Sequence, residues 1–351
     1  MNWKRITGLF RRAQPRPTRP RGTGQGQWET DSIHTASGSR KYKLWVPATY
    51  DPRCASPLVM MLHGCRQKPQ DLAEISGMNA IADRNNFLVV YPEQPLRANL
   101  LRCWNWFDPK HQARGAGEPA LLAAVIEKVS SHKRIDRARV YIAGISAGGA
   151  MAAVVGATYP DLIAAVGAVA GLEYKAASSL TEGLAAMKHG GPDPEQMGLL
   201  AYQTMTPGLS GRPKRMPVIV FQGDEDRYVN RINADQVISQ WATTNQCLHG
   251  DSGRSGIFTD VQVTQGMVPG GRSFEKHAYH DRVGHLIMEK WMVAGMDHAW
   301  PGSPVAADYA DPEGPNASEE MWRFFEETTR ESSDQPASRK NLFDRLAGLF
   351  R

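Results

Sequence analysis

The sequence predicts an α/β fold in which a mostly parallel central sheet is flanked by helices. Apolar segments of strand length alternate with segments of helical periodicity along most of the 351 residues, and this alternation is typical of parallel strands joined by helices. The segment 57–64 is a continuous apolar run and 87–94 begins with another, as expected for strands that are covered on both faces. These features together favour one large sheet with helices on each side.

The expected elements follow in chain order. Residues 40–47 alternate in polarity and are expected to form the first strand, and the two apolar runs enclose a segment of helical periodicity at 71–86. A helix is expected from Glu118, with Pro119 in its first turn, where proline is tolerated. The remaining expected strands are 139–145, 162–171, 216–226 and the first part of 284–300. The remaining expected helices are 147–160, 233–245 and 318–328.

Two stretches depart from this alternation. Residues 172–215 do not fit it, and we expect a helical insertion there that forms part of a substrate-facing wall. Residues 248–273 are rich in glycine and polar side chains, and hairpins or loops are expected. Neither stretch resembles a linker between domains, so residues 28–330 are predicted to form a single catalytic domain.

The net charge of +5 originates at the N-terminal end of the chain. Residues 1–22 contain seven lysines and arginines and no acid, so subtracting them leaves −2 for the remainder. Prolines among the arginines favour an extended segment, and we predict a disordered basic tail over 1–27 that is a candidate for contact with anionic surfaces. A short tail or helix is expected over 331–351. The body has no charge pattern that indicates nucleic-acid binding.

Composition also bears on compartment and cofactors. No run of 18 apolar residues is present, which argues against a membrane-spanning helix. The first residues lack the pattern of a secretory signal peptide, so a cytoplasmic location is the default expectation. The cysteines contain no CxxC pair, and neither a metal nor an organic cofactor is expected; they are Cys54, Cys65, Cys103 and Cys247.

The segment Gly-Ile-Ser-Ala-Gly at 144–148 joins a predicted strand to a predicted helix. Glycines two residues before and two after Ser146 allow a sharp, strained turn that holds the hydroxyl clear of the sheet. The first amides of the helix, including that of Ala147, then point at any negative charge that develops nearby. The same pattern also occurs as a plain packing turn, so Ser146 needs partners before it can be interpreted as a nucleophile.

Two later strand ends supply candidate partners. Asp226 ends the strand 216–226, and His298 follows the strand in 284–300. Ligands bind at the carboxyl ends of parallel strands, and the chain order Ser, acid, His is that of α/β-hydrolases. A serine hydroxyl needs a base to take its proton, and the imidazole needs a carboxylate to orient it. The sequence therefore predicts a catalytic triad of Ser146, Asp226 and His298.

Other residues are weaker candidates for the same roles. Asp224 lies in the same turn as Asp226 and stays a rival for the acid. His280 and His285 are rival bases, but both lie at or before the start of a strand, which is the wrong end of the sheet. Asp297 is interpreted as a solvated or loop-capping residue, because adjacent side chains diverge.

The strand 57–64 ends in the sequence Leu-His-Gly-Cys-Arg-Gln. A His-Gly turn at this point can present the amide of Cys65 beside that of Ala147, which gives two donors for a tetrahedral oxyanion. His63 is interpreted as a structural, hydrogen-bonding histidine.

With these residues in place, the chain resembles the poly(3-hydroxybutyrate) depolymerase family of esterases, whose relatives include feruloyl and acetylxylan esterases. The resemblance covers most of the chain, from about Arg40 to about Thr328. It rests on the segments LHGCRQ, SGMNAIADRNNFLVVYPEQ, RCWNWFDP, RGAGEP, VYIAGISAGGAMA, GDEDRYVN, GMDHAWPG and GPNASEEMWRFF. Members of the family are often extracellular.

The resemblance implies an α/β-hydrolase fold with Ser146 as nucleophile, Asp226 as acid and His298 as base. It implies oxyanion donors from the amides of Cys65 and Ala147. Because the segments HGC and CWNW recur together in the family, it also implies a disulfide between Cys65 and Cys103, with two reduced buried thiols as the alternative.

Aromatic residues are the expected apolar walls of the substrate pocket, and a place in the ordinary core is the alternative for each of them. They are Trp104, Trp106, Phe107 and Trp300.

The sequence thus predicts a serine carboxylic-ester hydrolase that cleaves short-chain or 3-hydroxyalkanoate oligomer or polymer esters through an acyl-enzyme. The short chain after residue 328 favours soluble oligomers or small esters over solid polymer. A feruloyl or acetylxylan esterase is the alternative within this class, and a serine peptidase on the same fold is less favoured. The alternative of another class is a non-catalytic protein that binds a polymer or a surface on a hydrolase scaffold.

Overall fold

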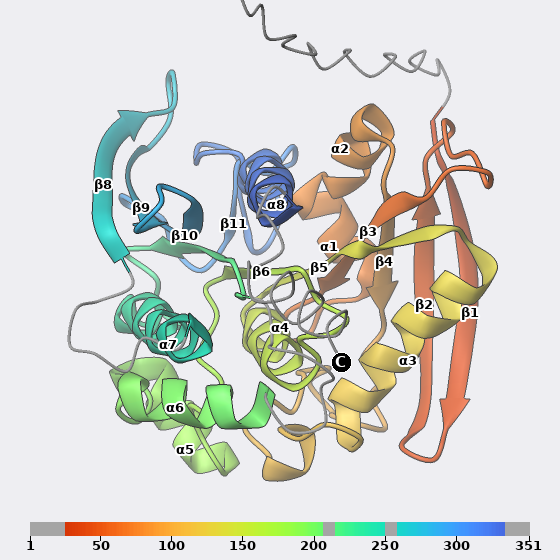
Figure 1. Cartoon of the computed structure of the whole chain (residues 1–351), viewed down its shortest axis with the longest axis horizontal. Coiled ribbons are helices and arrows are strands. Elements are labelled where there is room, and N and C mark those ends of the chain that lie inside the picture. The colour runs from red at the N-terminus through yellow and green to blue at the C-terminus, as the bar shows by residue number, and fades with distance from the viewer. Residues whose placement is uncertain (1–24, 206–214, 250–257, 334–351) are drawn as a thin grey trace, which may run out of the picture.

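The computed structural model describes residues 25–205, 215–249 and 258–333. Within these ranges, ten strands form one sheet in the spatial order β1-β2-β4-β3-β5-β6-β7-β10-β9-β8 (Figure 1). The strands from β4 to β10 are parallel, whereas β1–β2 and β9–β8 at the two edges are antiparallel hairpins. The bounds are β1 (Gln27–Thr35), β2 (Gly38–Val46), β3 (Ser56–Leu62), β4 (Leu88–Pro92), β5 (Ile135–Ile145), β6 (Ala165–Val169), β7 (Val218–Gly223), β8 (Phe258–Met267), β9 (Ser273–Asp281) and β10 (Leu286–Val293). The prediction of a mostly parallel sheet is confirmed.

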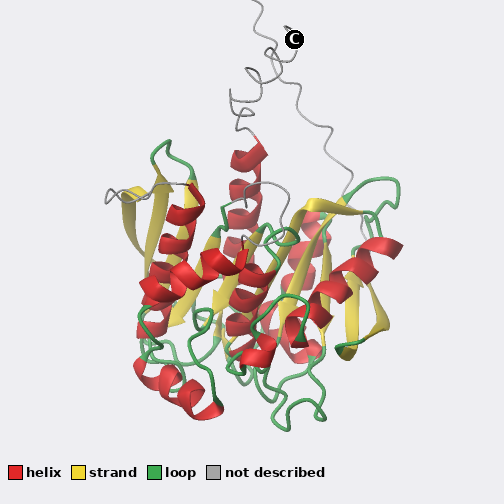
Figure 2. Cartoon of the chain, turned by 60° about the horizontal axis from the view of Figure 1, so that its bottom comes forward, coloured by secondary structure: helices red, strands yellow, loops and turns green. Residues whose placement is uncertain are grey.

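Helices cover both faces of this sheet, so that the strands lie between helical layers (Figure 2). One face packs against α3 (Gly117–His132), α4 (Ala147–Thr158), α6 (Pro194–Met205) and α7 (Ile232–His249). The other face packs against α1 (Pro69–Ser76), α2 (Met78–Asn85) and α8 (Ala317–Ser333).

Strand β3 shows why the apolar runs of the sequence are continuous. Successive residues of a strand point to opposite faces of its sheet. Met60 and Leu62 belong to the core under α3 and α4, whereas Val59 and Met61 belong to the core under α1, α2 and α8. Because both faces are covered, every residue of β3 is buried.

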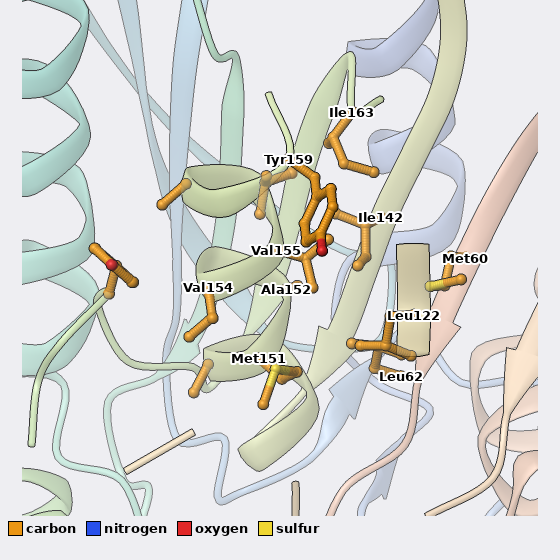
Figure 3. Packing of buried hydrophobic residues seen from close by; sticks show 14 of the residues in the cluster. Met60, Leu62, Leu122, Ile142, Met151, Ala152, Val154, Val155, Tyr159 and Ile163 are labelled. Carbon is orange, nitrogen blue, oxygen red and sulfur yellow. The ribbon is translucent and has the colours of Figure 1, made fainter. Parts of the chain in front are cut away.

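Helix α4 is buried along its entire length. Its sequence is almost purely small and apolar, which is typical of a helix that is surrounded on all sides. Figure 3 shows Met151 and Val155 of α4 beside Ile142 of β5 and Leu62 of β3. This packing fixes the start of α4, and therefore Ser146, against the ends of two neighbouring strands.

The order of the strands creates a crevice at one point of the sheet. Strand β4 follows β3 in the chain and lies on one side of it, whereas β5 lies on the other side. The connections that leave β3 and β5 therefore run in opposite directions, and ligands bind in the crevice that opens at such a switch point. The segment after β3 begins at His63, and the residue after β5 is Ser146.

At the edge of the sheet formed by the first strands of the chain, the hairpin β1–β2 contains one strand more than the sequence predicts. Only β2 was expected, because most residues of β1 are exposed and it carries no apolar signal. Since β1 begins at Gln27, the predicted tail over 1–27 overlaps its first residue. The tail up to residue 24 lies outside the described residues, and so does the segment after Ser333 in the predicted tail or helix over 331–351.

Two other segments have more structure than was expected. The helical segment 71–86 is divided into α1 and α2 by Gly77, whose φ of +61° ends the first helix in a left-handed conformation. The glycine-rich segment 248–273 contains β8, which pairs with β9 in a long hairpin. Val261 and Val263 are exposed on one face of β8, and Gln262 and Thr264 are exposed on the other, so β8 is covered on neither face.

The insertion predicted over 172–215 contains α5 (Leu180–His189) and α6, and its residues 206–214 lie outside the described ranges. Glu173, at the start of the insertion, is 1% exposed. Neither of its carboxyl oxygens has a hydrogen-bond partner among the described residues. Burial, with a smaller contribution from Asp193, raises the pKa of Glu173 to about 9.

This buried carboxyl predicts a pH-dependent stability. At neutral pH Glu173 is protonated in the folded chain and ionised in the unfolded chain, so folding takes up a proton. The free energy of unfolding should therefore fall as the pH rises from the ordinary carboxyl value of 4.5 to about 9. In Glu173→Gln the side chain keeps its size but no longer has a carboxyl group that can ionise. The melting temperature of this variant should exceed that of the wild type at pH 8, with a smaller difference at pH 5.

The exposed Glu195 of α6 offers a matched control. Glu195→Gln should follow the wild type at both pH values in the same thermal melts. Parallel melting curves for Glu173→Gln and the wild type across this range would contradict the assignment.

Candidate active site

The turn between β5 and α4 holds Ser146 in a strained backbone conformation. Its φ is +58° and its ψ is −125°, a region that costs a residue other than glycine about 1–3 kcal/mol. The amide of Ser146 donates to the carbonyl of Val169 over 2.8 Å, and its own carbonyl accepts from Ala150 over 3.0 Å. The turn is therefore fixed by β6 on one side and by the first bond of the helix on the other.

The glycines of this turn permit a close approach to β3. A Cβ on Gly148 would lie 2.1 Å from the carbonyl oxygen of Leu62, and one on Gly144 would lie 2.6 Å from the same atom. Both distances are too short for any side chain. The spacing Gly-x-Ser-x-Gly is thus required by contact between backbones as well as by the conformation of the serine.

Asp226 follows β7 and is held by a dense set of donors. Its side chain has no exposed surface. One carboxylate oxygen accepts from the amides of Tyr228 and Val229 at 2.8 Å, and the other accepts from Nε2 of Gln222 at 3.0 Å. These bonds satisfy both oxygens of a carboxyl group that is removed from water, and they fix its orientation.

His298 lies in the loop after β10 and contacts this carboxylate. Its Nδ1 is 2.7 Å from Oδ2 of Asp226. Because an ionised carboxylate only accepts, Nδ1 donates, and the proton-accepting position of the neutral ring is Nε2. The rings of Tyr228 and Tyr309 flank the imidazole, at centroid distances of 5.4 and 6.1 Å.

The structure places the rival acids and bases elsewhere. Asp224 accepts from the amide of Gly295 over 2.6 Å. His280 lies within β9, and His285 immediately precedes β10, at the end of that strand remote from the His298 loop.

Asp297 joins the loop of His298 to the turn of Asp226. Its Oδ1 accepts from the amide of Arg227 over 3.0 Å, and the guanidinium of Arg227 forms an ion pair with Oδ2. These hydrogen bonds lower the pKa of Asp297 to about 2. The carboxylate therefore holds two loops together, which is consistent with its interpretation as a loop-capping residue.

The segment after β3 presents the amide of Cys65. The neighbouring amide of Gly64 donates to Oε1 of Gln67 over 2.8 Å, whereas no hydrogen bond of the described residues uses the amide of Cys65. Ala147 is the first residue of α4, and the first amides of a helix have no acceptor within it. Cys65, Ala147, Ser146 and His298 line the same pocket.

His63 holds this segment in place as a neutral side chain. Its Nε2 accepts from the amide of Gln94 over 3.1 Å, so the ring proton is on Nδ1, which lies 2.8 Å from the carbonyl oxygen of Gly64. Burial lowers the pKa of His63 to about 4. Both ring nitrogens are thus occupied by structural hydrogen bonds.

A disulfide joins Cys65 to Cys103. Beside it, the amide of Arg66 donates to the carbonyl of Leu101 over 2.6 Å. The segment after β3 is therefore attached covalently to the loop that carries the expected aromatic residues. The other two cysteines, Cys54 and Cys247, are free.

The pocket around Ser146 has a volume of about 440 Å³ and a mainly apolar lining. Trp106 and Phe107 line it, as expected, but Trp104 and Trp300 do not, and for these two the expectation is corrected. Both are completely buried. The indole Nε1 of Trp104 donates to the carbonyl of His63 over 3.0 Å, and that of Trp300 donates to Oγ of Ser318 over 3.2 Å. The indole N–H groups of these two tryptophans therefore connect segments of the core by hydrogen bonds.

Other lining residues were not singled out from the sequence. The insertion supplies Leu172 before α5 and four residues of α5 itself, namely Leu180, Gly183, Leu184 and Met187. The spacing of these four is helical, but the sequence alone does not show which face of α5 meets the pocket. Tyr228 and Tyr309, beside His298, were also missed. Tyr228 follows closely after Asp226, and this position was its only signal.

Neither a metal-binding cluster nor a membrane-spanning helix occurs in the described residues. The described part of the chain contains no group of three or more His, Cys, Asp or Glu side chains that could hold a metal ion. None of the helices in the described ranges combines the length and the apolar character that crossing a bilayer requires.

The sheet order and the strained turn at Ser146 place the chain in the α/β-hydrolase fold class. The family model described as esterase PHB depolymerase matches residues 41–263. The chain belongs to this family.

Curated relatives and a solved structure agree with this assignment. The chain is 34% identical over 251 residues to poly(3-hydroxyalkanoate) depolymerase C of Paucimonas lemoignei, covering 71% of this chain and 56% of that protein. It is 28% identical over 192 residues to feruloyl esterase B of Neurospora crassa, covering 53% of this chain and 64% of that one. The chain thus spans less than two thirds of these relatives. The acetyl xylan esterase structure from Aspergillus awamori aligns with a TM-score of 0.65 at 18% identity, over 85% of this chain and 99% of that one, and so shares the fold.

The disulfide predicts a loss of stability when it is removed. It closes a loop with a sequence separation of 38 residues, and a cross-link of this span stabilises a fold by about 3–4 kcal/mol. Cys103→Ser should lower the free energy of unfolding in urea by about this amount. The free Cys54 provides the control, because Cys54→Ser breaks no cross-link. Equal unfolding midpoints for the two variants under non-reducing conditions would contradict the pairing.

Proposed function

We propose that the chain is a serine carboxylic-ester hydrolase of the polyhydroxybutyrate depolymerase type. One arrangement carries this proposal: Ser146 on its strained turn lines the same pocket as His298, whose Nδ1 contacts the buried carboxylate of Asp226 over 2.7 Å. This is the pattern of a nucleophile, a base and an orienting acid. Membership of the esterase PHB depolymerase family supports the same chemistry.

In the acylation step, Oγ of Ser146 attacks the ester carbonyl carbon while Nε2 of His298 takes the hydroxyl proton. Asp226 fixes the tautomer of His298 and stabilises the imidazolium that forms. The donors around Asp226 suit this role, because they hold its carboxylate in a fixed position beside His298. The negative charge on the carbonyl oxygen is received by the amides of Cys65 and Ala147.

The tetrahedral intermediate collapses when the bond to the leaving alcohol breaks and His298 returns its proton to that alcohol. The acyl group then remains on Ser146. In deacylation, His298 takes a proton from a water molecule that attacks the acyl carbonyl, and a second collapse releases the acid and restores the hydroxyl of Ser146. The cycle requires no cofactor.

The pocket favours an apolar ester of moderate size. Its mainly apolar lining matches the methyl-bearing repeats of a short 3-hydroxyalkanoate oligomer, and the depolymerase of Paucimonas lemoignei supports this substrate class. A second candidate is a hydroxycinnamoyl or acetyl ester. The aromatic rings of Trp106 and Phe107 in the lining favour a planar acyl group, and feruloyl esterase B is among the relatives.

The proposal predicts a large loss of turnover in Ser146→Ala. Removing a triad nucleophile leaves only the binding and oxyanion contributions, so kcat for p-nitrophenyl butyrate should fall by at least about 10³-fold. Circular dichroism should show an unchanged fold. If wild type and variant are equally inert on every ester tested, the alternative of a non-catalytic binding protein gains support.

The turn after β7 offers a matched pair of variants for the acid. Asp226→Asn should reduce kcat by about 10²–10⁴-fold, because the amide does not hold the required tautomer of His298. Asp224→Asn should change kcat little, since an amide oxygen can still accept from the amide of Gly295. A loss in Asp224→Asn that equals the loss in Asp226→Asn would overturn the assignment of the acid.

A substrate panel distinguishes the two ester classes. Initial rates should be measured on 3-hydroxybutyrate oligomers, methyl ferulate and p-nitrophenyl acetate with the same preparation. The higher kcat/KM is expected on the oligomers. A preference for methyl ferulate, reduced when Phe107 is changed to Ala, would instead favour the feruloyl class.

A further inference from the structure

A second cavity of about 320 Å³ lies apart from the pocket of Ser146 and shares no lining residue with it. It is bounded by the turn of the β1–β2 hairpin, by part of the loop between β4 and α3, and by the start of α3. Its lining is mainly polar and consists of Ser37, Gly38, Ser39, Arg40, Pro95, Arg97, Ala98, Asn105, His111, Gly117, Glu118 and Leu121.

Arg40, in β2, is the unusual member of this lining. It is 3% exposed, yet its guanidinium donates no hydrogen bond to any described residue. Its contacts are the carboxylate of Glu118, with Nη2 3.7 Å from Oε1, and the ring of Trp104 at 5.5 Å from the centroid. A buried guanidinium has five N–H donors and loses much free energy if they lack acceptors. The cavity beside it is where an acceptor can be supplied.

Glu118 does not supply that acceptor, because other donors already use its oxygens. Its Oε1 accepts from Nε2 of Gln94 over 2.5 Å and from Nδ2 of Asn105 over 2.8 Å. Its Oε2 accepts from the amide of Asn105 over 2.8 Å. Glu118 therefore offsets one positive charge at a distance and leaves the donors of Arg40 unused.

The other polar groups of the cavity are also mainly donors. Arg97 carries a second guanidinium, of which Nη2 donates to Oγ of Ser39 over 2.8 Å. Nδ1 of His111 accepts from the amide of Glu118 over 2.9 Å, which leaves the ring proton on Nε2. Two guanidinium groups against one carboxylate give the cavity a net charge of about +1 by formal counting.

We propose that this cavity binds a small monocarboxylate anion, held by the guanidinium of Arg40 and enclosed by Arg97. The planar fork of an arginine matches the two oxygens of a carboxylate. One net positive charge suits a monoanion, and the nearby carboxylate of Glu118 repels a dianion such as phosphate. The site does not depend on the proposed function, although the acid released by ester hydrolysis belongs to the same chemical class.

Calorimetric titration of the full chain with acetate, and separately with 3-hydroxybutyrate, tests this site. One saturable site in the millimolar range is expected, with weaker binding of inorganic phosphate and none of the neutral amide acetamide. No saturation with either carboxylate would overturn the proposal, and tighter binding of phosphate would overturn the assignment to a monocarboxylate.

Variants locate the binding. Arg40→Gln should weaken the affinity roughly ten- to hundred-fold, which is the loss expected for a charged hydrogen-bonding partner. Because Arg40 is buried, its variant should be checked by circular dichroism, and the exposed Arg97→Ala provides a second variant with an expected loss of about three-fold. Affinities that are unchanged in Arg97→Ala and in folded Arg40→Gln would place the anion elsewhere, for example in the pocket of Ser146, and would overturn the proposal.

Discussion

The close approach of two backbones, the turn at Ser146 and the end of β3, is the constraint on which the rest of the site depends. Gly144 and Gly148 leave room for the carbonyl of Leu62, so the turn that carries the hydroxyl and the segment that carries the amide of Cys65 are adjacent. The strain at Ser146 persists because β6 and α4 hold the residue from two sides. If this turn relaxed, the hydroxyl of Ser146 and the amide of Ala147 would both move away from the amide of Cys65. Packing of the sheet core therefore supports the geometry of the site directly.

Polar side chains that are buried at the site complete this framework through the hydrogen bonds that they form. Asp226 and His63 illustrate two ways of doing so. The carboxylate of Asp226 is surrounded by donors that hold it against His298, whereas the imidazole of His63 has both nitrogens in structural bonds and stays neutral. His63 and His298, which follow the carboxyl ends of β3 and β10, thus differ in role because of what their Nε2 atoms contact. His298 leaves Nε2 available, and His63 does not.

Much of this arrangement could be predicted from the sequence, because the signals were local. Continuous apolar runs indicated the parallel strands, and the spacing of glycines around Ser146 indicated the turn. The predicted residues Asp226 and His298 lie in contact in the structure. The pocket walls were harder to predict, because a buried tryptophan has the same sequence signal whether it faces a cavity or the core. Trp104 and Trp300 differ from Trp106 only in tertiary packing. Strand β1 was missed for a related reason, since a strand that is largely exposed has no apolar pattern.

The exposed strand β8 at the edge of the sheet determines where local unfolding of the sheet begins. Apolar burial holds the central strands, whereas β8, uncovered on both faces, is held mainly by its hydrogen bonds to β9. Local opening has the lowest free energy where few apolar contacts are lost, so hydrogen exchange should be fastest at this edge and slowest around β3 and β5. The loop of His298 leaves from β10, which lies between these two regimes. The pairing of β10 with β7 therefore anchors the start of this loop to the central strands of the sheet.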